Sequence, residues 1–159
     1  MKIFILIIFM IISNVLFSQS IKVETKKNIE WFETIPVSDI IEAGNDYGGA
    51  DTGTYTSNRD QTEITIKSKK HNRTVVKIRK EYNGNWPQNL DLQIRRTDNY
   101  NRDSNDGLIF QTITDVDNVF FYTTGNQKNV PIQYRIKGIS VLLPVQDYIA
   151  IIIYTVYDY

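Results

Sequence analysis

An alternation of apolar and polar residues runs through much of this chain, and it constrains the fold more than any other feature of the sequence. In residues 62–67, for example, two isoleucines alternate with glutamate, threonine and lysine. Successive side chains of a β-strand point to opposite faces of a sheet, so a period of two indicates a strand with one buried and one solvent-facing side. The pattern therefore predicts strands rather than helices.

The same pattern recurs in segments that are separated by turn-forming residues. Alternation is clearest in residues 76–79, 90–95 and 130–137, and short runs rich in β-branched and aromatic residues cover 109–115, 119–124 and 139–143. Turn residues lie between them, as in Asn83-Gly84-Asn85, Asp106-Gly107 and Gly125-Asn126. About eight short strands at this spacing predict an all-β fold, a single antiparallel immunoglobulin-like or pilin-like β-sandwich.

The first residues have the pattern of a secretory signal peptide. Lys2 gives a positive start, residues 3–12 are all apolar, and small and polar residues follow up to Ser18. The apolar run is shorter than the roughly 20 residues of a spanning helix. We therefore expect a signal peptide at 1–18 and a β-sandwich domain at 19–159 that is secreted, periplasmic or on the cell surface, with no transmembrane helix after cleavage.

The composition argues against several functions. The chain has no Cys, one His, and 18 basic against 18 acidic residues. Disulfides, thiolate metal sites and cysteine catalysis are thereby excluded, and the balanced charge argues against a nucleic-acid partner. The imidazole of His71 lies among cationic and polar neighbours, and the sequence has no Gly-x-Ser-x-Gly motif to supply a nucleophile. We expect a protein that is not an enzyme and that needs no cofactor.

Two loops rich in Asp and Asn, residues 44–53 and 98–107, contain the oxygen ligands that Ca²⁺ prefers. Neither loop has the residue order of a calcium-binding motif. Arg102 occupies a ligand position of the EF-hand pattern, and residues 48–51 lack the repeated Gly-Gly-x-Gly-x-Asp order. We expect solvated turns there and no metal site.

Charge is segregated along the chain although it sums to zero. Residues 39–63 hold six acidic residues and one Arg, whereas residues 64–81 hold seven basic residues and one Glu. The alternation places many basic residues on the outer faces of strands, among them Lys77, Arg79, Arg95, Arg96, Arg135 and Lys137. Two interpretations stay open: a surface for an acidic polysaccharide or lipid headgroups, or the solvated sides of strands whose lysines block edge pairing.

Aromatic residues offer a second kind of ligand surface. Trp86 follows a turn and Tyr100 lies in a polar loop, where an exposed ring can stack on the apolar face of a sugar. The alternative is that these rings pack in the core or anchor turns. The candidate ligand-binding residues are therefore Trp86, Tyr100, Lys77, Arg79 and Arg95, with a glycan as the candidate ligand.

Four isoleucines near the C-terminus, Ile149, Ile151, Ile152 and Ile153, make one segment apolar on both faces. Only one face of a strand meets the core of a two-layer sandwich, so the other face needs a cover. Each large apolar side chain left exposed forgoes about 1.5 to 3 kcal/mol relative to burial. We expect residues 21–41 or another protomer to cover this face, which makes the four isoleucines candidate interface residues.

The closing part of the chain resembles small secreted bacterial β-sandwich proteins. The run Gln133-Tyr134-Arg135-Ile136-Lys137-Gly138-Ile139-Ser140-Val141, followed by Tyr148 and by Tyr154-Thr155-Val156, is similar to the last strands of spore coat protein U and of WxL-type surface domains. The paired Trp-x-Leu signature of WxL domains is absent from this sequence. The resemblance implies a surface role and carries over no functional residue.

These patterns predict an exported surface or structural interaction module, adhesin-like or pilus- or coat-like, that takes part in adhesion without catalysis. Its partner would be another protein or a second copy, bound through the C-terminal strand. A carbohydrate-binding module is one alternative. A small outer-membrane β-barrel is another, because Tyr157 and Tyr159 alternate at the end of the chain, but several strands look shorter than the roughly 9 to 11 residues that a transmembrane strand needs.

Overall fold

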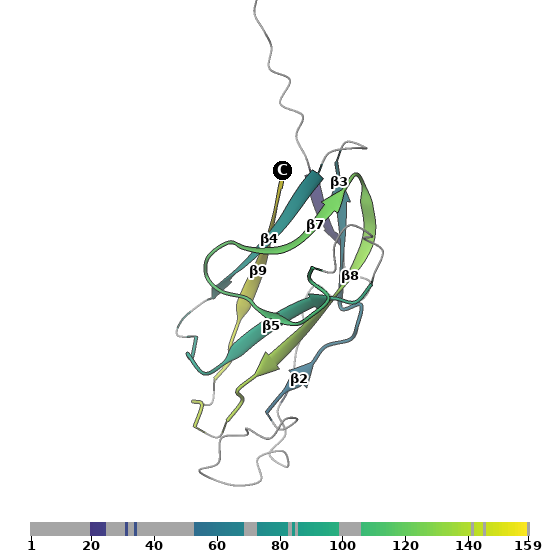
Figure 1. Ribbon diagram of the computed structural model, residues 1–159. Helices are drawn as coiled ribbons and strands as arrows, with labels where there is room; N and C mark the ends of the chain where they lie inside the picture. The colour runs from purple at the N-terminus through teal and green to yellow at the C-terminus, as the bar shows by residue number, and fades with distance from the viewer. Residues whose placement is uncertain are drawn as a thin grey trace, which may run out of the picture.

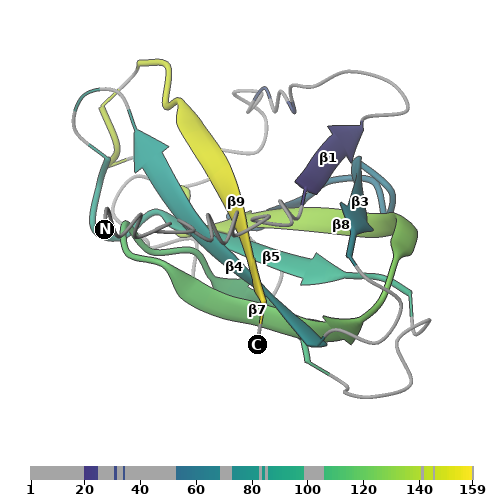
Figure 2. The ribbon, with the colours of Figure 1, turned by 90° about the horizontal axis from the view of Figure 1, so that it is seen from above.

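The chain forms two antiparallel β-sheets that pack face to face (Figures 1 and 2). The structure, a computed structural model, describes residues 20–24, 31, 34, 53–68, 73–82, 84, 86–98, 106–140, 142–144 and 146–158. The expected signal peptide, His71 and Tyr100 lie outside these residues. Within them every regular element is a strand, and there is no helix that could span a membrane.

The strands divide unequally between the two sheets. The larger sheet has the order β1 (Ser20–Glu24), β3 (Thr62–Lys67), β8 (Gln127–Lys137), β5 (Asp91–Arg96) and β6 (Gln111–Thr112), and β2 (Tyr55–Thr56) also pairs with β8. The smaller sheet has the order β7 (Asn118–Thr124), β4 (Arg73–Tyr82) and β9 (Ala150–Asp158). All pairs are antiparallel, which confirms the predicted all-β antiparallel sandwich.

The core lies between the inward faces of the two sheets. In β5 the burial alternates strictly along the strand, as the sequence pattern predicts. Each fully buried side chain contributes about 1.5 to 3 kcal/mol relative to an exposed one. The core cluster consists of Ile64, Ile66, Val76, Ile78, Leu92, Ile94, Ile113, Phe120, Phe121, Val130, Ile132 and Tyr134.

A β-bulge explains why two consecutive phenylalanines are both buried. Val76 of β4 pairs with Phe121 of β7, but Lys77 pairs with Val119, so Phe120 is the extra residue. A bulge interrupts the alternation of side chains, and here both rings turn inward and stack edge to face, with centroids 5.1 Å apart. A strict period of two could not have predicted this pair.

Two tyrosines tie the sheets together through their hydroxyls. Tyr134 of β8 and Tyr154 of β9 lie 2.8 Å apart, oxygen to oxygen, and the Thr62 hydroxyl also hydrogen-bonds Tyr134. Trp31 stacks on Tyr134, with ring centroids 6.4 Å apart. Trp31 also packs against the core cluster, and β1 approaches β9.

Two predicted strands are wrong or shorter than expected. Of the run 109–115, only Gln111–Thr112 is a strand, and Ile109 is 82 % exposed. The described residues of 139–143 form no strand. Both runs have suitable strand residues, but each contains too few positions that pair with a neighbour, and a strand needs a partner as well as a propensity.

Candidate interaction surfaces

The five predicted ligand-binding residues lie in different places. Lys77 and Arg79 project from β4 on the outer face of the smaller sheet, because their neighbours Val76 and Ile78 face the core. Arg95 projects from β5 on the outer face of the larger sheet, on the opposite side of the sandwich. Trp86 lies at one end, and Tyr100 is outside the described residues. These residues therefore do not form one binding site.

The cations of the smaller sheet are already engaged. The Arg79 guanidinium forms ion pairs with Glu81 at 2.8 Å and with Asp117 at 3.5 Å. The Lys77 ammonium lies 5.1 Å from the ring centroid of Tyr157 in a cation–π contact. Such pairs at a solvated surface stabilise little, but they leave these two cations less available to a ligand.

Trp86 anchors a turn and packs in an aromatic cluster at the end of the sandwich. Its Nε1 donates to the Leu90 carbonyl at 2.6 Å. Its ring lies 6.4 Å from both Tyr82 and Tyr148, and the Lys80 ammonium lies 4.8 Å from its centroid. The ring of Trp86 is half-buried among these neighbours. Trp86 therefore anchors a turn, which is the second of the two roles that the sequence left open.

The outer face of the larger sheet carries an ordered network of arginines and glutamines. Arg95 donates from Nε to the Gln133 side-chain oxygen at 2.8 Å. Arg135 donates from Nε to the Gln93 oxygen at 2.8 Å and makes a second, shorter bond to the same oxygen through Nη2. The Phe110 ring covers both guanidiniums, whose central carbons lie 4.4 Å (Arg95) and 3.9 Å (Arg135) from its centroid. Each arginine is thus fixed by a neutral amide and an aromatic ring.

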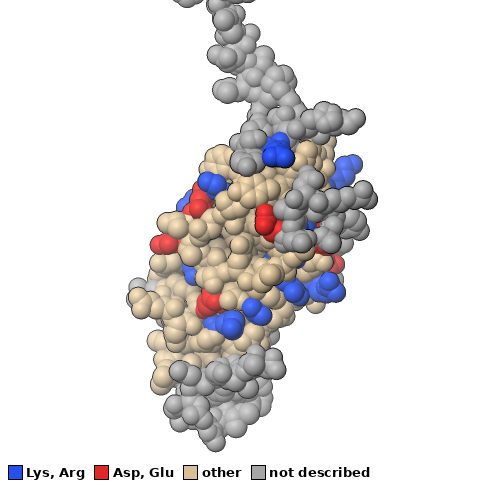
Figure 3. All heavy atoms as spheres, in the orientation of Figure 1, with Lys and Arg blue, Asp and Glu red and all other residues tan. Residues whose placement is uncertain are grey.

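Basic residues continue in a row on both sides of this network. Lys137 follows Arg135 along β8, and Arg59 lies beyond Arg95, where its Nη2 donates to the Thr97 carbonyl at 3.4 Å. Figure 3 shows basic side chains gathered across the face over β5 and β8. Burial lowers the pKa of Arg95, and the positive charges of Arg59 and Arg135 lower it further. We call Arg59, Arg95, Arg135 and Lys137 the basic row.

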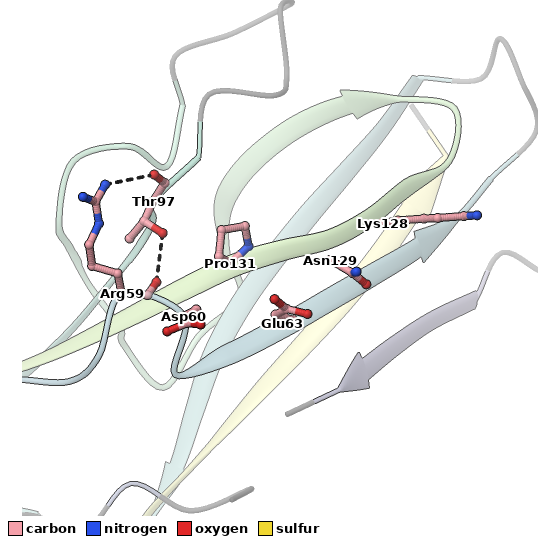
Figure 4. Close-up of a pocket in the computed structure, with 7 residues that line it drawn as sticks. All are labelled: Arg59, Asp60, Glu63, Thr97, Lys128, Asn129 and Pro131. Atoms are coloured by element: carbon pink, nitrogen blue, oxygen red, sulfur yellow. Dashed lines mark hydrogen bonds between the residues drawn. The ribbon is translucent and has the colours of Figure 1, made fainter. Parts of the chain in front are cut away.

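A hollow with a volume of about 550 Å³ opens beside one end of the basic row. Figure 4 shows its lining residues, which come from β3, from β8, from the turn before β3 and from the residue after β5: Arg59, Asp60, Glu63, Thr97, Lys128, Asn129 and Pro131. Thr97 and Arg59 close one wall, since the Thr97 hydroxyl donates to the Arg59 carbonyl at 2.8 Å. The lining mixes acids, bases and amides, so the hollow has no apolar floor of the kind that holds most small ligands.

Arg96 does not belong to the outer basic face, which corrects the sequence interpretation. Arg95 and Arg96 are consecutive, so a strand must direct them to opposite faces, and Arg96 is only 1 % exposed. It donates to the carbonyls of Asp106 at 2.6 Å and Asp98 at 3.1 Å, and it pairs with the Asp98 carboxylate at 3.7 Å. Burial raises the pKa of Asp98, and the charge of Arg96 opposes that shift. Arg96 holds the two ends of a loop and is not a ligand site.

The C-terminal strand shows which candidate interface residues are exposed. Ile151 is 59 % exposed and Ile153 is partly exposed on the outer face of β9, and Ile149, which directly precedes the strand, is 57 % exposed. Ile152 points the other way and packs against the core cluster. The outer face of the strand therefore presents apolar side chains that the described residues leave uncovered.

The edge of β9 differs from the other sheet edges. β1 contains Lys22 and Glu24, β6 is two residues long, and β7 has a bulge and follows Asp117. β9 keeps an uninterrupted register with β4 over nine residues, and its only charged residue is Asp158 at its end. In the part of the chain that the structure describes, β4 is its only hydrogen-bonded neighbour. Charges, bulges and short lengths normally protect edges from pairing with another chain, and β9 has none of these devices.

The sequence interpretation missed the glutamines and the phenylalanine that organise the larger sheet. Gln93 and Gln133 alternate with Ile94 and Ile132, so their outward direction was available from the period of two. Their pairing with arginines across strands was not available, because it depends on the register of β5 with β8. Phe110 lies in a loop and gave no periodic signal.

The described residues contain no cluster of three or more His, Cys, Asp or Glu side chains that could hold a metal ion. Comparisons with protein-family models, with curated proteins and with solved structures gave no match to this chain.

Proposed function

We propose that this protein is an exported, non-catalytic interaction module that associates with a second copy of itself through β9. The observation that carries the proposal is the combination of a regular edge whose one charge, Asp158, lies at its end with the exposed isoleucines at the start of the same strand. The apolar segment at the N-terminus of the sequence supports export.

The outer face of β9 favours association because water contacts large apolar side chains there. Ile149 and Ile151 are each more than half exposed. Fully burying such a side chain is worth about 1.5 to 3 kcal/mol, so a partner that covers even part of both gains free energy. Isolated exposed isoleucines are common, but here Ile151 lies on the strand that also has an unprotected edge, and Ile149 directly precedes it.

The edge is also self-complementary. Two antiparallel copies of β9 related by a twofold axis at Tyr154 would place Ile151 opposite Tyr157 and Ile153 opposite Thr155 of the second copy. All these residues have the same parity, so they would share the outer face of one continuous sheet. Pairs of aliphatic, aromatic and β-branched side chains opposite each other stabilise a sheet by about 0.2 to 1 kcal/mol each. A symmetric pairing is the commonest form of association between identical chains.

Sedimentation velocity over a range of concentrations tests this proposal. We expect the purified protein to form dimers as its concentration rises, and we expect Ile151→Lys to stay monomeric because it places a charge on the pairing edge. Ile109→Lys is the matched control, since it changes an isoleucine that is 82 % exposed and lies away from β9. The control should dimerise as the parent does.

All three proteins should show the same circular dichroism and the same unfolding midpoint within a few degrees, because both substituted side chains are exposed. A parent protein that stays monomeric at every concentration contradicts the proposal. An Ile151→Lys variant that dimerises as strongly as the parent contradicts it as well.

A further inference from the structure

We propose that the basic row on the outer face of the larger sheet binds a linear polysaccharide that carries carboxylate groups. The row lies on the opposite sheet from β9, so this site does not depend on the self-association proposed above. The residues that carry the inference are Arg59, Arg95, Arg135 and Lys137.

The first argument is that the arginine donors are oriented but not neutralised. Arg95 uses only its Nε, for Gln133, and none of the described residues accepts a hydrogen bond from its two terminal nitrogens. Arg135 bonds the amide oxygen of Gln93. No described carboxylate lies within ion-pair distance of either guanidinium, so both keep a full positive charge that a carboxylate can pair with in a two-pronged geometry.

The second argument is that the side chains are already held in place. The Phe110 ring lies against both guanidiniums, and each arginine is also bonded to a glutamine on the neighbouring strand. Long cationic side chains usually lose rotational freedom when they bind, which weakens binding. Here the fold has restricted them beforehand.

The third argument is that the cations of the row follow one another along and across the neighbouring strands β8 and β5. Arg135 lies opposite Gln93, and Arg95 lies opposite Gln133, so the two cations alternate between β8 and β5. Lys137 is two residues beyond Arg135, a step of about 7 Å along a strand. Asp91 lies opposite Lys137, at the end of the row. A line of cations along neighbouring strands fits a polymer with repeated acidic groups better than it fits a small molecule.

The surroundings of the row favour a sugar acid over a nucleic acid. Binding of single strands without sequence preference relies on aromatic rings that are free to stack on bases. The Phe110 ring is instead stacked against two guanidiniums. The amide nitrogens of Gln93 and Gln133 are engaged with the Asp91 carboxylate and the Ser57 carbonyl, so the two glutamines orient the arginines and leave ligand recognition to the cations.

Isothermal titration calorimetry with polygalacturonate tests the site. We expect binding that weakens as salt is added, since exposed charges are screened. Arg95→Gln and Arg135→Gln should each weaken binding roughly tenfold or more, because each removes a hydrogen bond to a charged group. Lys137→Gln, an exposed side chain at the end of the row, should weaken binding less and cannot disturb the core.

Arg73→Gln is the matched control. Arg73 is an exposed arginine on β4 of the smaller sheet, and its loss changes the net charge by the same amount. It should bind polygalacturonate as the parent does, and fully methyl-esterified polygalacturonate should not bind to any variant.

Three results would overturn the inference. Equal binding by the parent, Arg95→Gln and Lys137→Gln would show that the row is not the site. An equal loss in Arg73→Gln would show that only net charge matters. Tighter binding of a single-stranded oligothymidylate than of polygalacturonate would assign the row to nucleic acid instead.

Discussion

The hydrogen bond between Tyr134 and Tyr154 predicts that removing the two hydroxyls, one at a time, lowers the free energy of unfolding by different amounts. Removing the Tyr154 hydroxyl leaves Tyr134 with Thr62 as its remaining partner, so Tyr154→Phe loses one ordinary hydrogen bond. We expect a loss of about 1 kcal/mol in the free energy of unfolding. Tyr134→Phe removes the central hydroxyl of the three and leaves two groups without this partner, which should cost about 2 kcal/mol.

The double variant follows from the same contacts. With both hydroxyls gone, only Thr62 has lost a partner, so the combined loss should be about 2 kcal/mol rather than the sum of the single losses. Urea unfolding at pH 7, followed by tryptophan fluorescence, measures all four proteins. Trp31 stacks on Tyr134 and makes the signal sensitive to this part of the core. A larger loss for Tyr154→Phe than for Tyr134→Phe, or strictly additive losses, would refute the reasoning.

The same pair predicts a loss of stability at high pH. Burial raises the pKa of Tyr134, and it raises the pKa of Tyr154 well above the ordinary value of 10.0, with the neighbouring phenol adding to that second shift. Below the pKa of the unfolded phenols both states are protonated, and the contribution to stability is complete. As the pH rises above about 10, the unfolded state loses protons that the folded state retains, so stability falls until the folded phenols ionise too. Unfolding midpoints measured upward from about pH 9 should fall less steeply for the double Phe variant.

Three further outcomes are expected from thermal or urea unfolding. Gly138→Ala should destabilise by clearly more than Gly84→Ala: both glycines have φ near +85°, but a Cβ at Gly138 would lie 1.9 Å from the Asn89 carbonyl oxygen, whereas a Cβ at Gly84 meets nothing within 4 Å. Equal losses would contradict the close approach. Arg96→Met should cost about 3 to 5 kcal/mol because it leaves the Asp98 carboxylate buried without its charge partner, and a loss below about 1 kcal/mol would contradict that role. Unfolding midpoints in EDTA and in calcium chloride should agree, and a calcium-dependent rise of several degrees would reveal a site in the Asp- and Asn-rich loops.

The fold class was predictable because the period of two is a local property of the sequence. In β5 the buried positions are the ones that the alternation indicates, whereas in β3 Glu63, which the alternation places on the solvent face, is also buried. The paired phenylalanines of β7 were not predictable, since a bulge depends on the register with β4. The run that contains Ile109 forms a strand only at Gln111–Thr112, where it pairs with β5, and Ile109 lies outside that pairing and is exposed.

The surfaces were less predictable than the fold, because they combine residues from distant strands. Arg95, Arg135 and Lys137 were identified by type and alternation, but their placement on one sheet face depends on the register of β5 with β8, and Arg59 comes from the turn before β3. Grouping Arg95 with Lys77 and Arg79 failed because the sequence does not say which strands share a sheet. The apolar C-terminal strand was recognised, and only its burial shows that Ile152 faces inward while Ile151 faces outward.

Hydrogen exchange of the β9 backbone amides tests the central claim of self-association most directly. Alternate amides of a strand point to opposite sides, so β4 bonds one set and leaves the other set on the free edge. Pairing with a second copy predicts that this second set becomes protected as the protein concentration rises, while the first set and β7 stay unchanged. Exchange of the edge amides that is fast and independent of concentration would contradict the account.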